Sequence, residues 1–522
     1  MKRIADNICL AFTVVVFACF TIVPAANAFG VDPPPDGGYR NNNTAEGDNA
    51  LFKLTFGHDN TAIGASALQT NSYGNGNTAT GSFALQGNNA GDNNTATGAS
   101  ALFSNVRGQA NTADGSHALF NNNRASFNTA IGASALFSNF RGDANTATGF
   151  SALSGNTTGS YNTATGVNAL QGNSGHYNTG IGAYAGGGGG VYNTATGAYA
   201  LTGSTGSYNA ASGAYTLFGT SGNFNTASGY SALLSNTTGH DNTAGGFRAL
   251  NDNTTGNFNT ACGSSALGSN TIGGKNSASG VFALSSNTTG HDNTASGNSA
   301  LNHNTTGSFN TVLGSNAGGN LTTGDNNIDI GNAGVAGESN TMRLGTVRLT
   351  ATYISGIRGT TTANADAVPV VIDSAGQLGT VSSSARFKDQ IKPMDNSSEA
   401  ILGLKPVTFH YKSDSKETPQ FGLIAEDVAK VNPDLVVRDD NGEIYTVRYE
   451  VVNAMLLNEF LKEHRKVEEQ QATIAELKSS SAKQAATVAQ QQKQIDALTA
   501  GLQKVTARVE ATNSASRVVS DN

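Results

Sequence analysis

Residues 382–388 carry the side chains best suited to covalent chemistry: a serine run, Ser382 to Ser384, followed by Arg386 and Lys388. A serine hydroxyl is a weak nucleophile until a base removes its proton, and a lysine can be that base where burial lowers its pKa. Ser383 and Lys388 stand five residues apart, a spacing that is also common by chance. The segment is therefore either a plain linker or a place where the chain is cut, and the surrounding sequence distinguishes the two.

The rest of the chain offers little other chemistry. Only 17 of the 289 residues from Asn43 to Gly331 are charged, whereas a calcium-binding solenoid needs an aspartate in nearly every turn. The same region has no carboxylate cluster for an enzyme acting on external polysaccharide. The formal net charge of −7 argues against nucleic acid as a partner. We expect no metal and no cofactor.

The N-terminus has the pattern of an export signal. Lys2 and Arg3 precede an apolar run from Ile8 to Val23, and small residues follow at Ala26-Asn27-Ala28. This pattern predicts a signal peptide over residues 1–28, because the apolar run is short for a membrane span. We expect a secreted or cell-surface protein with no transmembrane segment in the mature chain. Its one remaining cysteine, Cys262, cannot form an intramolecular disulfide.

A repeat of 17 residues dominates residues 43–331. Its consensus is roughly N-T-A-x-G-x-x-A-L-x-x-N-T-T-G-x-x, and the spacing falls to 15 or 16 only between Asn162 and Asn225. Glycine and asparagine in every copy oppose a helix. Thr-Ala-x-Gly alternates like a strand, and Asn-Thr-Thr-Gly is typical of a turn. The pattern predicts a β-solenoid with one coil per repeat.

The repeat also predicts what holds the coils together. Stacked copies of the leading asparagine can form an amide ladder, as in cross-β assemblies. The buried side chains are expected to be alanine and leucine, for example Ala67 and Leu68. Because these residues are small, one coil buries little apolar area, and three chains wrapped together would bury more. A homotrimer is therefore favoured.

These Asn-Thr-Ala-x-Gly-x-x-Ala-Leu units resemble the head repeats of YadA-like trimeric autotransporter adhesins. The resemblance implies a β-roll in which three chains associate, and an adhesive role with a surface or glycan ligand. The polar C-terminus, SASRVVSDN, lacks the alternating strands of that family's membrane barrel.

The composition changes after residue 331, where 44 of 191 residues are charged. Apolar stretches bounded by turn residues predict a β-rich neck over 332–382 and a mixed α+β region over 383–452. A weak heptad then predicts a coiled-coil helix over 453–511. Its two apolar positions hold Phe460, Val467, Ile474, Val488, Ile495, Leu502 and Val509, and Leu456, Leu477, Leu498 and Val505.

The C-terminal motifs resemble the intramolecular chaperone domain of phage endosialidases and tailspikes, also found in myelin regulatory factor. Ser-x-x-Arg-x-Lys at 383–388 is followed by Leu404-Lys-Pro-Val-x-Phe409 and Gly422-Leu-Ile-Ala-Glu-Asp-Val428. The resemblance implies a domain that trimerises a β-rich fibre and then releases itself. It assigns Ser383 as nucleophile, Lys388 as base and Ser382–Ser383 as the cleaved bond. That family commonly has aspartate where this chain has Ser384.

The leading hypothesis is an exported homotrimeric fibre, mainly β, with a self-cleaving serine endopeptidase that turns over once in cis. The alternative is a purely structural surface protein that keeps its C-terminal domain.

Overall fold

The computed structural model describes residues 39–439 and 441–517, which form two compact units divided after Tyr353. The predicted signal peptide over 1–28 lies outside the described residues. Within the described residues, no helix is both long and apolar enough to cross a bilayer.

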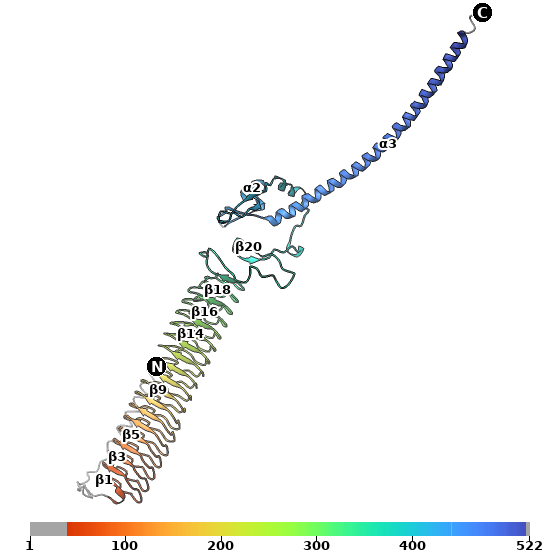
Figure 1. The fold of residues 1–522 in the computed structure, drawn as a ribbon. Coiled ribbons are helices and arrows are strands. Elements are labelled where there is room, and N and C mark those ends of the chain that lie inside the picture. The colour runs from red at the N-terminus through yellow and green to blue at the C-terminus, as the bar shows by residue number, and fades with distance from the viewer. Residues whose placement is uncertain (1–38, 440, 518–522) are drawn as a thin grey trace. The chain divides into compact units, whose positions relative to one another are not determined.

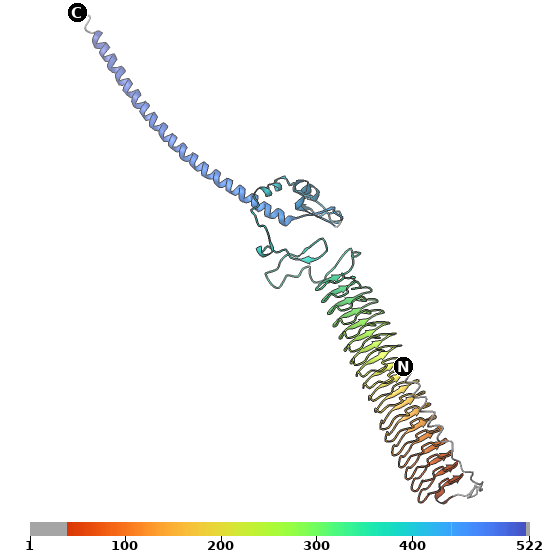
Figure 2. The ribbon, with the colours of Figure 1, turned by 180° about the vertical axis from the view of Figure 1, so that it is seen from behind.

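The first unit is a parallel β-solenoid, which confirms the predicted fold (Figures 1 and 2). Each coil contributes one three-residue strand, and each strand pairs in register with the next along the chain. At about 4.8 Å per strand, the sheet is roughly 85 Å long. The strands are β1 (Thr44–Glu46), β2 (Thr61–Ile63), β3 (Thr78–Thr80), β4 (Thr95–Thr97), β5 (Thr112–Asp114), β6 (Thr129–Ile131), β7 (Thr146–Thr148), β8 (Thr163–Thr165), β9 (Thr179–Ile181), β10 (Thr194–Thr196), β11 (Ala210–Ser212), β12 (Thr226–Ser228), β13 (Thr243–Gly245), β14 (Thr260–Cys262), β15 (Ser277–Ser279), β16 (Thr294–Ser296), β17 (Thr311–Leu313), β18 (Ile328–Ile330) and β19 (Met342–Leu344). A 3-10 turn, η1 (Arg40–Asn42), precedes them.

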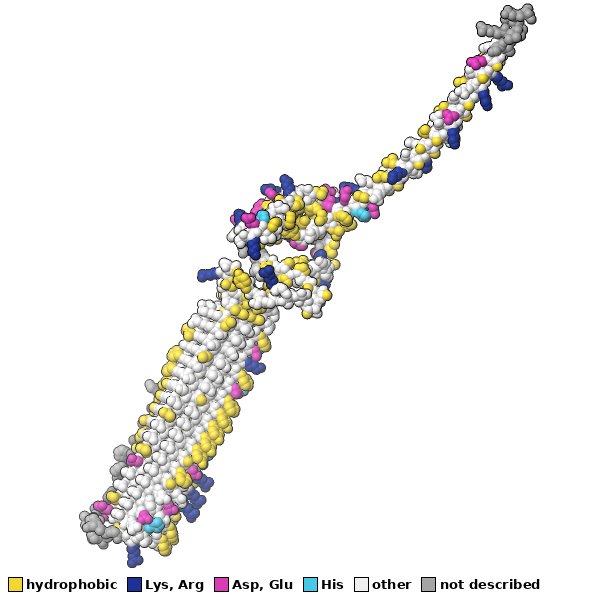
Figure 3. Space-filling model, viewed as in Figure 1, with side chains coloured by type: hydrophobic (Ala, Val, Ile, Leu, Met, Phe, Trp, Pro, Cys, Tyr) yellow, Lys and Arg dark blue, Asp and Glu magenta, His cyan; other side chains and the backbone are white. Residues whose placement is uncertain are grey.

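The core of the solenoid is the alanine and leucine stack that the repeat predicts. The middle residue of each strand points inward, as Ala62, Ala79 and Ala96 do, while its two neighbours face outward. The Ala-Leu pair that follows, such as Ala84 and Leu85, is fully buried. Charged side chains are sparse on the face of the solenoid that Figure 3 shows. One coil therefore buries little, and its stability depends on its neighbours above and below.

Two asparagine ladders run inside the solenoid. In the first, Asn60 donates its Nδ2 to Asn43 Oδ1 at 3.0 Å, and the same contact recurs in most coils. In the shortened coils, Asn178, Asn193 and Asn209 instead donate their backbone N–H to the Oδ1 of the preceding asparagine. In the second, formed by the asparagine of the Asn-Thr-Thr turn, Asn88 Nδ2 donates to Asn71 Oδ1 at 2.8 Å. The first ladder confirms the prediction. The second was predicted only as a turn, because nothing within a single repeat shows that its amide faces inward.

The glycine that follows each strand permits close approach between coils. Gly98 has φ 123°, and a Cβ on it would lie 2.7 Å from the carbonyl carbon of Gly115. Only glycine adopts this backbone readily.

The second unit contains small paired elements and one long helix. Its strands form three antiparallel pairs: β20 (Val371–Ile372) with β21 (Leu378–Gly379), β22 (Val407–Phe409) with β23 (Gln420–Gly422), and β24 (Val436–Arg438) with β25 (Ile444–Val447). The helices are the 3-10 segments η2 (Ala385–Phe387), η3 (Asp395–Gly403) and η4 (Pro433–Leu435), then α2 (Ala425–Val431) and α3 (Tyr449–Arg517). The fully buried core is small and consists of Val428, Leu435, Val436, Val447 and Met455.

Candidate functional site

The serine run lies in an exposed segment just before η2. Ser384 is extended (φ −66°, ψ 136°) and caps a single 3-10 turn that separates the serines from Lys388. The backbone N–H of Ser384 donates to Ser382 Oγ at 3.3 Å, and that of Lys388 donates to the Ala385 carbonyl at 3.1 Å. The turn thus keeps the serines and Lys388 on one short stretch of chain.

Ser383 and Lys388 are not joined in the single chain. Both are exposed, and neither side chain has a hydrogen-bond or ion-pair partner within residues 39–439 and 441–517. Arg386 lies over the ring of Phe387, with its guanidinium carbon 4.6 Å from the ring centroid. A lysine base needs a desolvated setting, and the described residues of this unit leave Lys388 exposed, so a working site requires further cover.

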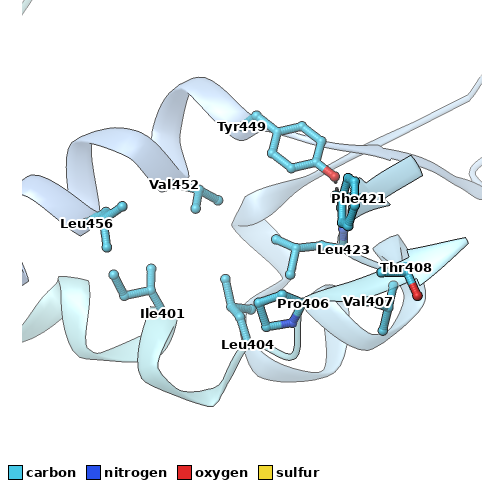
Figure 4. A pocket seen from close by; sticks show the side chains of 11 residues that line it. Ile401, Leu404, Pro406, Val407, Thr408, Phe421, Leu423, Tyr449, Val452 and Leu456 are labelled. Atoms are coloured by element: carbon cyan, nitrogen blue, oxygen red, sulfur yellow. Dashed lines mark hydrogen bonds between the residues drawn. The ribbon is translucent and has the colours of Figure 1, made fainter. Parts of the chain in front are cut away.

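An apolar groove of about 660 Å³ lies in the same unit (Figure 4). Its walls come from η3, from the β22–β23 hairpin and from the first turns of α3, and the phenol oxygen of Tyr449 accepts a hydrogen bond from the Leu423 N–H at 3.0 Å. The lining side chains labelled in the figure are Ile401, Leu404, Pro406, Val407, Thr408, Phe421, Leu423, Tyr449, Val452 and Leu456. Phe421 is 81% exposed, which is costly for so large an apolar side chain. The groove was not predicted, because a sequence shows which residues are apolar but not which are left uncovered.

A buried polar cluster joins η3 to α3 on another side of the unit. Ser398 is fully buried, accepts a hydrogen bond from Asn458 Nδ2 at 2.6 Å and donates one to Glu459. Lys462 Nζ lies 2.7 Å from Glu459 Oε1 and 3.5 Å from Ser398 Oγ. The partners stand about sixty residues apart, so no local motif indicates the cluster.

Ser398 and Lys462 are thus a serine and a lysine in contact, but their surroundings oppose catalysis. Hydrogen bonding to Glu459 raises the pKa of Lys462, so the ammonium form is favoured and the amine is a poor base. The hydrogen bonds from Lys462 and Ser398 lower the pKa of Glu459. We therefore interpret this cluster as a clamp between η3 and α3.

The helix α3 carries a long row of uncovered apolar side chains. Every member of the two heptad positions is exposed, from 39% for Val467 to 73% for Leu498. The structure thus shows the predicted C-terminal helix, and its pairing with other helices stays a prediction.

Comparison with known protein families gives one match. Residues 383–437 match the family described as chaperone of endosialidase, so the chain contains this domain, and the family implies a trimer. No curated protein and no solved structure matches the chain significantly.

Proposed function

We propose that this chain is an exported homotrimeric fibre whose C-terminal domain assembles it and then cuts itself off at the Ser382–Ser383 bond. The chaperone-of-endosialidase domain at residues 383–437 is the observation that carries the proposal. Export rests on the signal-peptide pattern over 1–28. The solenoid would make the contact with a surface or glycan, as in adhesin heads.

Trimerisation is supported by apolar surface that a single chain leaves uncovered. Leu456 belongs both to the groove and to the heptad row of α3, and Tyr449 lies one heptad before it. The groove and the row are therefore two parts of one strip along the same helix. Sustained heptad spacing favours association of helices, and contiguous exposed apolar patches commonly mark interaction sites. In the proposed trimer, neighbouring copies cover both.

Light scattering on the full chain tests the interface. The uncleavable Ser383→Ala chain should have the mass of three chains, and adding Leu477→Glu with Leu498→Glu should shift it to the monomer by placing charges in the seam. Ala486→Glu, on the opposite side of the heptad, is the matched control and should remain trimeric. A stable monomer of the Ser383→Ala chain would contradict the proposal.

The cleavage chemistry uses Ser383 and Lys388. Lys388 takes the proton from the Ser383 hydroxyl, and Oγ attacks the carbonyl carbon of Ser382. The C–N bond then breaks, the proton passes to the Ser383 nitrogen, and an ester joins Ser382 to Ser383 Oγ. Water hydrolyses this ester and separates the two chains. Cover from neighbouring copies would supply the desolvation that a lysine base needs.

Intact mass and N-terminal sequencing test the cut. The wild type should give two fragments, with a new N-terminus at Ser383. Ser383→Ala and Lys388→Arg should each give an uncleaved trimer, because the first lacks the nucleophile and a guanidinium keeps its proton. If Lys388→Arg were cleaved as completely as the wild type, Lys388 would not be the base.

The second candidate is an uncleaved structural fibre, which the separation of Ser383 from Lys388 in the single chain favours. An uncleaved wild-type trimer would support this candidate. Ser384→Asp would then test whether the serine in place of the family's usual aspartate accounts for the missing cleavage.

A further inference from the structure

The tyrosines of this chain are concentrated on one stretch of the solenoid. Eight of the 14 tyrosines lie between residues 161 and 230. Four of them, with Phe224, form a stacked ladder of five rings whose neighbouring centroids lie 4.8–5.1 Å apart: Tyr161, Tyr177, Tyr192, Tyr208 and Phe224. A second ladder, Tyr184, Tyr199 and Tyr215, has spacings of 5.0 and 5.1 Å.

The two ladders border the outer faces of the same strands. Tyr177 precedes β9 by two residues and Tyr184 follows it by three, and the next coils repeat this arrangement. The outward residues between them are uncharged: most are threonine or serine, such as Thr194 and Thr196 of β10, and the exceptions are Ile181 of β9 and Ala210 of β11. The surface is therefore a strip of hydroxyl and methyl groups with a row of tyrosines on each side.

The tyrosine hydroxyls in this strip have no partner among the residues that the structure describes. The five rings of the longer ladder are 46–56% exposed. Within the described residues, none of the tyrosines of either ladder makes a side-chain hydrogen bond. Because the rings cover one another's faces, they present their edges and hydroxyls to solvent.

The surrounding stretch also lacks charge. Residues 144–240 contain no Asp, Glu, Lys or Arg. A third ladder elsewhere in the solenoid, Phe103, Phe120 and Phe137, stacks at 4.9 and 5.1 Å without any hydroxyl, and its coils contain Arg107 and Arg124. Stacking alone therefore does not require tyrosine, and the hydroxyls of the uncharged stretch need another explanation.

Packing between copies does not explain the ladders. A face along which parallel solenoids pack would recur in every coil, whereas the longer ladder occupies only five coils. The same position holds Ala144 before the ladder and Asp241, Phe258 and Lys275 after it. The ladders also coincide with the shortened coils between Asn162 and Asn225, where the second asparagine ladder is replaced by Ser204 and Thr220. This stretch differs from the rest of the rod in several independent respects.

We infer that the tyrosine-bordered strip of residues 161–224 binds an uncharged linear polysaccharide. A neutral, hydroxyl-rich polymer matches a surface without charge that offers a periodic row of hydroxyls, and an anionic polymer would find no cation there. Figure 3 shows hydrophobic side chains in rows along an edge of the solenoid, with few charges beside them. The inference rests on the proposed role of the solenoid in surface contact.

Affinity electrophoresis of the full chain tests this inference, in native gels containing dextran, soluble β-glucan or galactomannan, with hyaluronate as the charged comparison. The wild type should be retarded by at least one neutral polymer and not by hyaluronate. The triple variant Tyr177→Phe, Tyr192→Phe, Tyr208→Phe should bind at least about tenfold more weakly, because it keeps the rings and removes three hydrogen-bonding groups. Phe224 already occupies this ladder, so phenylalanine fits there. Tyr73→Phe, an exposed tyrosine outside the strip, is the matched control.

Three results would overturn the inference: no retardation of the wild type by any neutral polymer, equal retardation of the triple variant, or a changed oligomer mass in that variant with polymer binding intact. Should the triple variant lose β-structure, the single variant Tyr192→Phe replaces it. A trimer that binds no polymer defeats only this inference, because light scattering tests the proposed assembly separately.

Discussion

Replacing the buried Asp329 by asparagine should stabilise the last coils of the solenoid at neutral pH and leave them unchanged in acid. Asp329 is the middle residue of β18, a position that alanine, valine or, in β9, glycine fills in the preceding coils. It is fully buried, and neither carboxylate oxygen has a hydrogen-bond partner within the described residues. Burial raises the pKa of Asp329 to about 6; Glu338 adds to the rise and Arg343 opposes it.

The sign and size of the effect follow from this pKa. The unfolded chain keeps the ordinary value of 3.8, so the folded coil holds a proton that the unfolded chain releases between about pH 4 and pH 6. Stability is therefore highest below this window and falls as the pH rises through it. A difference of about two pKa units corresponds to roughly 3 kcal/mol of destabilisation at neutral pH. Asparagine keeps the shape and removes the charge.

Hydrogen exchange of the peptide covering β18 and β19 measures the effect, because terminal coils open locally. At neutral pH, exchange in Asp329→Asn should slow by up to about two orders of magnitude. Near pH 4 the variant and the wild type should agree. Asp114→Asn, an exposed carboxylate in β5, is the control and should change neither rate. Equal slowing at both pH values, or faster exchange in the variant at neutral pH, would refute the charge as the cause.

Three further substitutions test the packing. Asn111→Ala should lower the free energy of unfolding by roughly 2–4 kcal/mol, because the Asn111 amide donates to Asn94 and Ala125 and accepts from Asn128. Urea unfolding followed by circular dichroism measures this, and an unchanged free energy would show that the ladder does not stabilise the solenoid. Gly98→Ala should prevent normal coil stacking, whereas Gly245→Ala, whose Cβ would meet nothing nearer than 3.9 Å, should be tolerated; thermal melts that fail to separate the two would contradict this. Ser398→Ala should lower the free energy of unfolding by about 1–3 kcal/mol and speed hydrogen exchange in η3, while replacing the exposed Ser397 by alanine should do neither. Equal exchange rates in the two variants would contradict the interpretation of the Ser398 cluster as a clamp.

The solenoid was predictable because its information is local and repeated. One copy of Asn-Thr-Ala-x-Gly already contains the strand, the inward alanine and the glycine that needs positive φ. The second ladder was missed for the opposite reason: Asn71 and Asn88 are recognisable as ladder members only once the coils are stacked. Asp329 was missed because its strand reads as a faded repeat, and its burial depends on the coils around it.

The candidate site was predictable only in its residue types. Ser383 and Lys388 are identified by their motif, but their assignment as a catalytic pair stays a prediction, since no hydrogen bond joins them within the described residues. The Ser398 clamp and the apolar groove bring together residues of η3 and α3 that lie far apart in sequence. No periodicity or motif marks such contacts.

The repetition that builds the solenoid also makes its alignment with other copies ambiguous. Successive coils present the same threonine, alanine, asparagine and leucine at the same positions, so two chains displaced by 17 residues would meet nearly identical surfaces. Such a slip is opposed where the sequence departs from the repeat, as in the shortened coils between Asn162 and Asn225. Residues 354–517 contain no 17-residue repeat, so a trimer that begins there has one alignment. Since pairing between distant segments is slow and open strand edges invite wrong partners, the proposed order of assembly first and cleavage second follows: once contacts along the whole rod hold the register, the domain that set it is no longer needed.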